Sequence, residues 1–147
     1  MSSLGHSVCC YDIDVEKISR LRQCDIPIVE EGLEELVRAN LDLDTLRFTN
    51  ELSDALHDSE YIFLCLPTPQ GEDGSADVSY LVNAVKQMAT QLPTGCTVIN
   101  KSTVPIGTTH VIRKLIDRSD VAVASNPEFL REGTAISDFF IADRIVI

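Results

Sequence analysis

Short apolar segments alternate with longer amphipathic segments along the whole chain. Continuous apolar runs predict strands, whereas apolar side chains three or four positions apart predict helices that cover a sheet. The predicted strands span 7–11, 46–49, 61–66, 96–100, 121–124 and 144–147. The predicted helices span the segment after Asp14, then 30–41, 51–57, 81–92, the segment after Gly107, and 133–139. This order predicts an α/β fold with right-handed crossovers in one parallel sheet.

Two segments allow more specific predictions. The helix over 30–41 carries Leu33, Leu36 and Val37 on one face, and Glu30 and Glu31 near its start, where the helix dipole favours carboxylates. The run over 61–66 is apolar without interruption, which predicts a strand covered on both faces. The turn-rich segment 67–75 follows this strand directly and is a predicted surface loop, at the sheet edge where ligands of open α/β folds bind.

Composition narrows the class of protein. The chain has 147 residues, 44% of them hydrophobic, which suits one domain with a real core. Aromatic residues make up only 5% of the chain, which favours helices on a parallel sheet over a β-sandwich. The formal net charge of −11, with no run of Lys or Arg, argues against nucleic acid or an anionic membrane as a partner.

The cysteines and the chain's start indicate a compartment. The five cysteines form no C-x-x-C pair, and four of them lie in apolar runs, which is typical of a reduced cytoplasmic protein without disulfides or a zinc site. The first residues carry neither a basic nor an apolar segment, so we expect no signal sequence, and no run of about 18 apolar residues occurs. The segment from Asp73 to Asp77 resembles part of a calcium loop, but Gly71 and Pro69 stand where oxygen ligands are needed, so we expect no metal.

Four polar segments lie at or beyond strand ends. They read YDIDVEK (11–17), LPTP (66–69), KSTVPIG (101–107) and NPEFLREG (126–133). In this order they resemble the NAD-binding domain of the UDP-glucose/GDP-mannose dehydrogenase family, and EEGLEEL (30–36) and DRIV (143–146) match further family positions. The resemblance covers nearly the whole chain and implies a Rossmann-like, doubly wound, mostly parallel sheet.

The resemblance implies NAD as the cofactor. Asp12 follows the first strand, where a carboxylate can accept hydrogen bonds from ribose hydroxyls and disfavour a 2′-phosphate. Asp12 and Asp14 are also interpretable as carboxylates at a helix start, and Lys17 as a solvated lysine. Prolines 67 and 69 are equally compatible with an ordinary rigid turn. The implied cofactor contacts are Asp12, Lys17, Leu66, Pro67, Thr68, Pro69, Ser102, Thr103 and Glu132.

The resemblance also implies residues for catalysis and for the nucleotide sugar. Thr103 would position a water or hydroxyl, and Glu128 could orient water for a hydrolytic stage. A threonine at a strand end and acids before a helix have simpler explanations as capping groups. The implied substrate contacts are Glu128, Phe129, Leu130, Arg131 and Glu132.

Parts of the family pattern have no counterpart in the sequence. Leu4-Gly5-His6 matches the end of the first helix, so neither the first strand nor the G-x-G-x-x-G loop is represented, and we expect one incomplete domain over 1–147 with open sheet edges. Such a fold would be marginal, or completed by another chain or a homo-oligomer. The family's nucleophilic cysteine lies in a second domain, and none of the five cysteines is a credible substitute.

The resulting functional hypothesis is the NAD-binding part of an oxidoreductase. Such an enzyme converts a UDP- or GDP-sugar, of the UDP-glucose type, to its uronic acid by two hydride transfers. One alternative is a remnant or nucleotide-sugar binding module without turnover. Another is an interaction protein that uses the open sheet edge.

Overall fold

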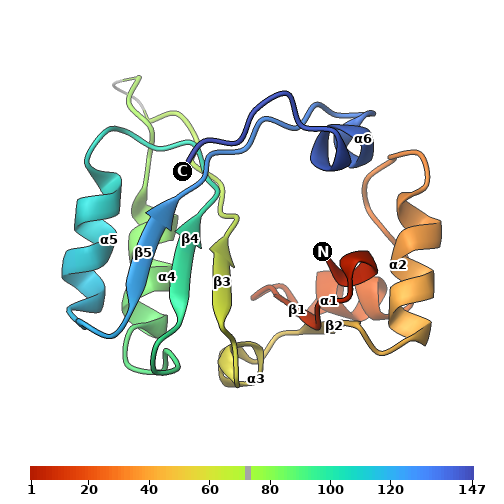
Figure 1. Ribbon diagram of the computed structural model, residues 1–147, viewed down its shortest axis with the longest axis horizontal. Helices are drawn as coiled ribbons and strands as arrows, with labels where there is room; N and C mark the ends of the chain where they lie inside the picture. The colour runs from red at the N-terminus through yellow and green to blue at the C-terminus, as the bar shows by residue number, and fades with distance from the viewer. Residues whose placement is uncertain (72–73) are drawn as a thin grey trace. The chain divides into compact units, whose positions relative to one another are not determined.

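The computed structural model of the protein describes residues 1–71 and 74–147 (Figure 1). These residues form two compact units. The first comprises Met1–Ala55 and Phe129–Asp143, and the second comprises Leu56–Glu128 and Arg144–Ile147. Glu72 and Asp73 lie outside the described residues, and with them the Asp73 position of the rejected calcium loop.

The first unit is built on two parallel strands. It contains η1 (Ser2–Leu4), β1 (Val8–Tyr11), α1 (Val15–Arg22), α2 (Leu33–Asp42), β2 (Leu46–Thr49) and α6 (Ala135–Phe140), and it ends at Ala55 within α3 (Leu52–Leu56). Val8 lies opposite Leu46 and Tyr11 opposite Thr49 in the β1–β2 register. Ile18 of α1 is 1% exposed and is the most buried apolar side chain of this unit.

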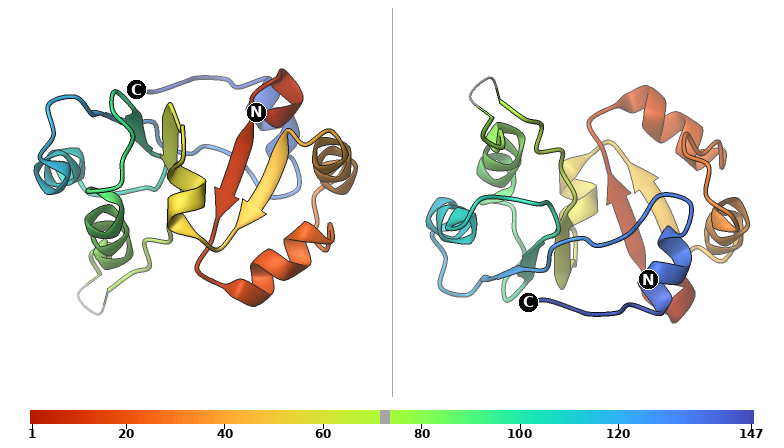
Figure 2. Two further views of the ribbon diagram at one scale, coloured as in Figure 1. Left: turned by 90° about the horizontal axis from the view of Figure 1, so that it is seen from below. Right: turned by 90° about the horizontal axis from the view of Figure 1, so that it is seen from above.

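The second unit is a three-stranded parallel sheet with helices on one side (Figure 2). It contains β3 (Tyr61–Leu64), α4 (Ser79–Met88), β4 (Thr97–Asn100), α5 (Thr108–Ile116) and β5 (Ala122–Ser125), with the strand order β3-β4-β5. Leu81 and Val85 of α4 and Ile112 of α5 are almost completely buried. They supply the apolar layer that covers the sheet.

Only one face of this sheet is well covered. Ile62, Val98 and Val123 lie opposite one another in the register, and Val98 and Val123 are buried. On the other face Tyr61 is 62% exposed and Phe63 is 37% exposed. The prediction of a strand covered on both faces is therefore wrong, because α4 and α5 lie on the same side of the sheet.

Most predicted elements are confirmed, with ends shifted by a few residues. The helix predicted over 30–41 begins at Leu33, after Gly32, whose φ of 79° is in the left-handed region. The strand predicted over 144–147 is wrong: this segment is irregular and exposed. The Asn126 side chain donates a hydrogen bond to the Val146 carbonyl at 2.8 Å. This hydrogen bond holds one point of the segment, which joins no strand ladder among the described residues.

The described strands form two separate sheets, each made of parallel strands. The prediction that all strands lie in one sheet is therefore wrong. β1 and β3 each lie at the end of their strand order. In the doubly wound class the strands corresponding to β1 and β3 both neighbour the first strand, which no segment of this sequence supplies. The expected open edges are thus present at both strands. In the described part of the chain no helix has the length and apolarity needed to span a bilayer.

Candidate functional site

Parallel pairing brings three polar segments of the second unit to one end of its sheet. Leu64, Asn100 and Ser125 lie side by side in the register as the last residues of β3, β4 and β5. The segments that follow them, LPTP, KSTVPIG and the start of NPEFLREG, therefore leave the sheet at the same edge (Figure 1). This is the edge at which open α/β sheets bind ligands.

Ser102 fastens two of these segments together. Its hydroxyl donates to the Leu66 carbonyl at 2.7 Å and accepts from the Leu66 amide at 3.0 Å. Thr68 adds a second link, because its hydroxyl donates to the Thr103 carbonyl at 2.9 Å. The Ser102 side chain is 9% exposed and engaged with backbone, so it shapes the segment carrying Pro67 and Pro69. A direct contact from this hydroxyl to a cofactor stays a prediction.

Lys101 organises the third segment. Its ammonium lies 3.1 Å from Asn126 Oδ1 and 3.3 Å from Glu128 Oε2, and its side chain is 19% exposed. The Glu128 amide also donates to the Lys101 carbonyl at 3.2 Å. The predicted catalytic carboxylate is therefore held by a lysine that the sequence analysis did not assign. The sequence signal for this role is a lysine directly after an apolar strand, because a shielded ammonium needs hydrogen-bond acceptors or a carboxylate nearby.

Cys65 borders the same cluster. Burial raises the pKa of the Cys65 thiol, with Lys101 opposing this effect and Glu128 adding to it. Burial likewise raises the pKa of Cys9 and Cys96, although Arg47 and Arg118 oppose it. A thiol with a raised pKa is protonated at neutral pH and is a weak nucleophile. The expectation that no cysteine of this chain replaces the family's nucleophile stays a prediction.

Asn100 is a second residue at this edge of the sheet that the sequence pattern does not indicate. It is completely buried at the end of β4, and its amide nitrogen donates to the Ser102 carbonyl at 3.0 Å. Its side-chain oxygen finds no hydrogen-bond partner among the described residues. Thr103, two residues beyond Lys101, is exposed, so its hydroxyl is accessible for the predicted positioning role, which stays a prediction.

Asp12 stands directly after β1 in the first unit. Lys17 Nζ lies 2.6 Å from its Oδ2, and the Asp14 amide donates to its Oδ1 at 3.0 Å. Partial burial opposes ionisation, but the hydrogen bonds from Lys17 and Asp14 outweigh it and lower the pKa of Asp12. Asp12 is therefore an ionised carboxylate that is 30% exposed. Asp14 caps α1 by accepting from the Lys17 amide at 3.0 Å, as its alternative interpretation expects.

The predicted substrate residues continue from one unit into the other along the chain. Glu128 belongs to the second unit, and Phe129 begins the returning part of the first unit. Phe129 and Leu130 are 46% and 39% exposed. Arg131 is bound to Asp138, with Nη2 2.6 Å from Oδ1 and Nε 3.0 Å from Oδ2. Glu132 is exposed.

Comparison with known proteins identifies the family. The family model for the NAD-binding domain of the UDP-glucose/GDP-mannose dehydrogenase family matches residues 1–147. The chain belongs to this family. It is 44% identical to the UDP-glucose 6-dehydrogenase of Pseudomonas aeruginosa, an alignment that covers 99% of this chain and 34% of the relative. It is 43% identical to the UDP-glucose 6-dehydrogenase YwqF of Bacillus subtilis over 100% of this chain and 34% of the relative.

Solved structures show the same fold. A ternary complex of GDP-mannose dehydrogenase from Pseudomonas aeruginosa superposes with a TM-score of 0.90 and 32% identity, over 98% of this chain and 36% of that chain. A UDP-glucose dehydrogenase from Pyrobaculum islandicum superposes with a TM-score of 0.88 and 37% identity. This match covers 98% of this chain and 35% of that chain. The protein is thus a Rossmann-like NAD-binding domain that spans about a third of the length of these relatives.

The described residues of this NAD-binding domain suit a dinucleotide at its ribose end. The Asp12 carboxylate is ionised and partly exposed, which is what an acceptor for two ribose hydroxyls requires. Its charge would repel a 2′-phosphate, in agreement with NAD as the cofactor. Bound NAD would supply a hydride acceptor. The role of Asp12 as an oriented hydrogen-bond acceptor for the ribose stays a prediction.

Proposed function

We propose that the chain is the cofactor-binding part of an NAD-dependent UDP-glucose 6-dehydrogenase. In that reaction UDP-glucose is oxidised to its uronic acid by two successive hydride transfers. The observation that carries the proposal is the match of the NAD-binding family over residues 1–147, joined to an ionised Asp12 held in place by Lys17. UDP-glucose is favoured over GDP-mannose because relatives named UDP-glucose 6-dehydrogenase are 43–44% identical to this chain.

The residues have distinct proposed roles. Asp12 and Lys17 bind the adenosine ribose, and Leu66, Pro67, Thr68 and Pro69 present backbone groups to the cofactor. Ser102 holds that segment in shape through Leu66. Thr103 positions a water or hydroxyl. Glu128 orients water for hydrolysis, with its carboxylate fixed by Lys101. The segment from Glu128 to Glu132 contacts the nucleotide sugar, and Glu132 also contacts the cofactor.

The chain by itself is proposed to bind without turnover. Two oxidations at one carbon need a covalent intermediate or an equivalent hold on the aldehyde between them. The raised pKa values of the Cys9, Cys65 and Cys96 thiols favour their protonated, weakly nucleophilic forms, which supports this proposal. Binding without turnover is the second candidate function, a nucleotide-binding module. The five free cysteines support a reducing compartment, the cytoplasm, as its location.

Calorimetry tests the cofactor proposal. We expect the chain to bind NAD more tightly than NADP, and to form no NADH with UDP-glucose. Asp12→Asn should weaken NAD binding about tenfold, because a charge-assisted hydrogen bond to the ribose is lost. Asp25→Asn is the matched control, since Asp25 also pairs with a cation of α1, at 2.6 Å from Arg20. NADP binding as tight as NAD, or equal NAD affinity in Asp12→Asn, would contradict the proposal.

A partner for the open edge of β1 is proposed as well. β1 lies at the end of the two-stranded sheet, so one side of its backbone has no ladder partner among the described strands. A sheet edge of this kind accepts an added strand from another copy of the chain or from a complementing chain.

A further inference from the structure

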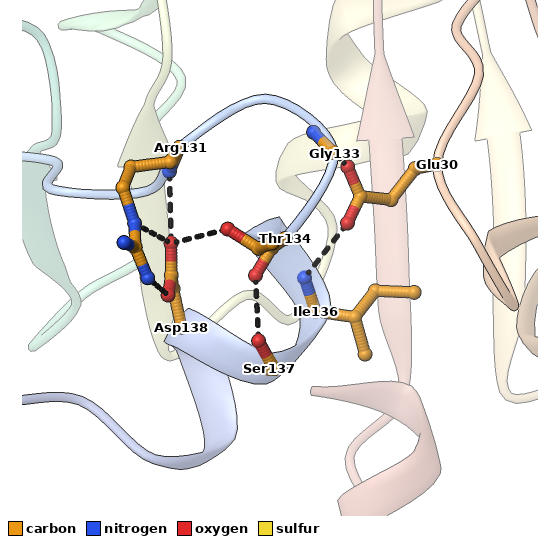
Figure 3. A network of polar contacts seen from close by, with 7 residues as sticks. All are labelled: Glu30, Arg131, Gly133, Thr134, Ile136, Ser137 and Asp138. Atoms are coloured by element: carbon orange, nitrogen blue, oxygen red, sulfur yellow. Dashed lines mark hydrogen bonds and ion pairs between the residues drawn. The ribbon is translucent and has the colours of Figure 1, made fainter.

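The Glu30 side chain joins two distant parts of the first unit (Figure 3). Its Oε2 accepts a hydrogen bond from the Gly133 amide at 2.8 Å, and its Oε1 accepts from the Ile136 amide at 3.3 Å. Gly133 and Ile136 lie 103 and 106 positions after Glu30 in the sequence. One carboxylate therefore bridges two amides at the start of the segment that forms α6.

The local backbone explains why Glu30 is available for this contact. α2 begins only at Leu33, after Gly32 in the left-handed region, and Glu34 and Glu35 are the acids of its first turn. The predicted role of Glu30 as a carboxylate at the start of α2 is therefore wrong. Glu30 lies in the turn before the helix, where its carbonyl accepts from the Leu33 amide at 3.2 Å and its side chain reaches elsewhere.

The segment that Glu30 contacts has a shape defined by its own polar groups. The Asp138 carboxylate accepts from the Arg131 guanidinium, from the Arg131 amide at 3.0 Å and from the Thr134 hydroxyl at 3.2 Å. The Ser137 hydroxyl donates to the Thr134 carbonyl at 3.0 Å. These bonds all lie within residues 131–138. They close the turn but do not fasten it to the rest of the unit.

We infer that Glu30 is a positioning residue for the nucleotide-sugar segment of this domain. The inference rests on the proposed function, in which the residues from Phe129 to Glu132 contact the nucleotide sugar. α6 has only six residues and follows this segment directly, so it gains little stability from its own hydrogen bonds. Glu30 supplies a hydrogen-bonded fixed point immediately after this segment. Ordering the segment before the ligand arrives removes part of the entropy loss of binding.

Glu30→Gln and Glu31→Gln form a matched pair of variants. Each removes one carboxylate at neighbouring positions, so the net charge changes equally, and Glu31 is exposed. In Glu30→Gln we expect amide hydrogen exchange at Gly133 and Ile136 to accelerate at least about tenfold, and UDP-glucose affinity to fall about threefold to tenfold. Binding of adenosine monophosphate, which uses Asp12, should stay unchanged. Glu31→Gln should behave like the unmodified chain in all three measurements.

The outcomes separate the inference from the proposed function. Unchanged exchange at Gly133 and Ile136 would overturn the inference, as would faster exchange with unchanged UDP-glucose affinity. Equal losses of UDP-glucose and adenosine monophosphate affinity would indicate general unfolding and would also overturn it. If Glu30→Gln does not fold, Glu30→Asp decides by the same criteria, because the shorter side chain cannot span both amides. Failure of the unmodified chain to bind UDP-glucose overturns the proposed function, whereas exchange still tests whether Glu30 anchors the segment.

Discussion

At the scale of single residues, Ser102 shows how one hydroxyl can shape a binding edge. It both donates to and accepts from the backbone of Leu66, thirty-six positions earlier, and so closes a small ring between the ends of β3 and β4. The Leu66 amide and carbonyl are partly shielded there and have this hydroxyl as their partner. Removing it leaves polar groups that must find other acceptors and donors.

Ser102→Ala should therefore destabilise the second unit. We expect a loss of about 1–3 kcal/mol in its free energy of unfolding, the usual range for a buried group left without its partner. Urea denaturation at neutral pH measures this loss. Ser119→Ala, an exposed serine in the same unit, serves as the control and should change the free energy little. Equal stability of the two variants would show that the Leu66 groups are satisfied by water.

The sequence indicates which charged residues are candidates for the site, but not which residues they pair with. Asp12 was predicted from its place after a strand, and the structure gives it the ionised, partly exposed carboxylate that such a role needs. The ion pairs of Asp12 with Lys17 and of Glu128 with Lys101 depend on side-chain conformation, which the spacing of residues in the sequence does not determine. Because acids favour helix starts, the sequence places Glu30 in the helix, but the left-handed Gly32 sets the start of α2 at Leu33.

At the scale of elements, the turn before α6 is stabilised by a single acidic side chain. Hydrogen bonds from Arg131, with a smaller contribution from Thr134, hold the pKa of Asp138 well below its usual value of 3.8. A carboxyl group whose pKa is lower in the folded state stabilises that state at pH values above its unfolded pKa. The contribution disappears as the pH falls through the folded pKa.

Asp138→Asn provides the corresponding test. At neutral pH the variant should unfold at a lower urea concentration than the unmodified chain, because the ion pair with Arg131 is gone. The difference should begin to shrink as the pH falls below 3.8, where the unfolded chain takes up the proton, and should vanish only as the pH falls through the lower pKa of the folded state. Asp42→Asn, an exposed aspartate of α2, controls for the general effect of charge. A difference that grows with acidity would refute the assignment.

Apolar periodicity predicts where the helices and strands lie in the sequence. It does not predict which strand faces are covered or which strands pair. The segments that became β2, β4 and α5 carry clear patterns and appear where they were predicted. The run from 61 to 66 is equally apolar on both faces, so it cannot reveal that α4 and α5 lie on one side. The segment 144–147 has the composition of a strand, but a strand exists only with a ladder partner, and the sequence does not specify one.

At the scale of the whole molecule, the proposed association with another chain depends on the side of β1 that does not pair with β2. The amides of Val8 and Asp12 donate to carbonyls on and beside β2, at 2.8 and 3.2 Å. In a parallel ladder alternate residues face the same neighbour, so the amides of Cys9 and Tyr11 face away from β2. These groups are available to an added strand.

Cys9→Pro tests the proposed pairing at this edge. Proline removes the outward amide of Cys9 and leaves the amides that face β2 in place. We expect the unmodified chain to self-associate with rising concentration in sedimentation equilibrium, and Cys9→Pro to shift this association to concentrations at least about tenfold higher. Cys9→Ala keeps the amide and should associate like the unmodified chain. A chain that remains monomeric throughout, or equal association of the proline variant, would refute pairing through β1.

The discontinuity of the first unit has a consequence for the order of events on the ribosome. Residues 56–128 form most of the second unit from one continuous stretch, whereas the first unit draws on Met1–Ala55 and on Phe129–Asp143. Because synthesis proceeds from the amino terminus, the contact from Glu30 to Gly133 and Ile136 cannot form until the later segment has emerged. The first unit can complete its contacts only after residues 129–143 have been synthesised. By residue 128 the second unit already has nearly all of its own residues. Closing so long a loop is entropically unfavourable, and its formation is expected late in folding.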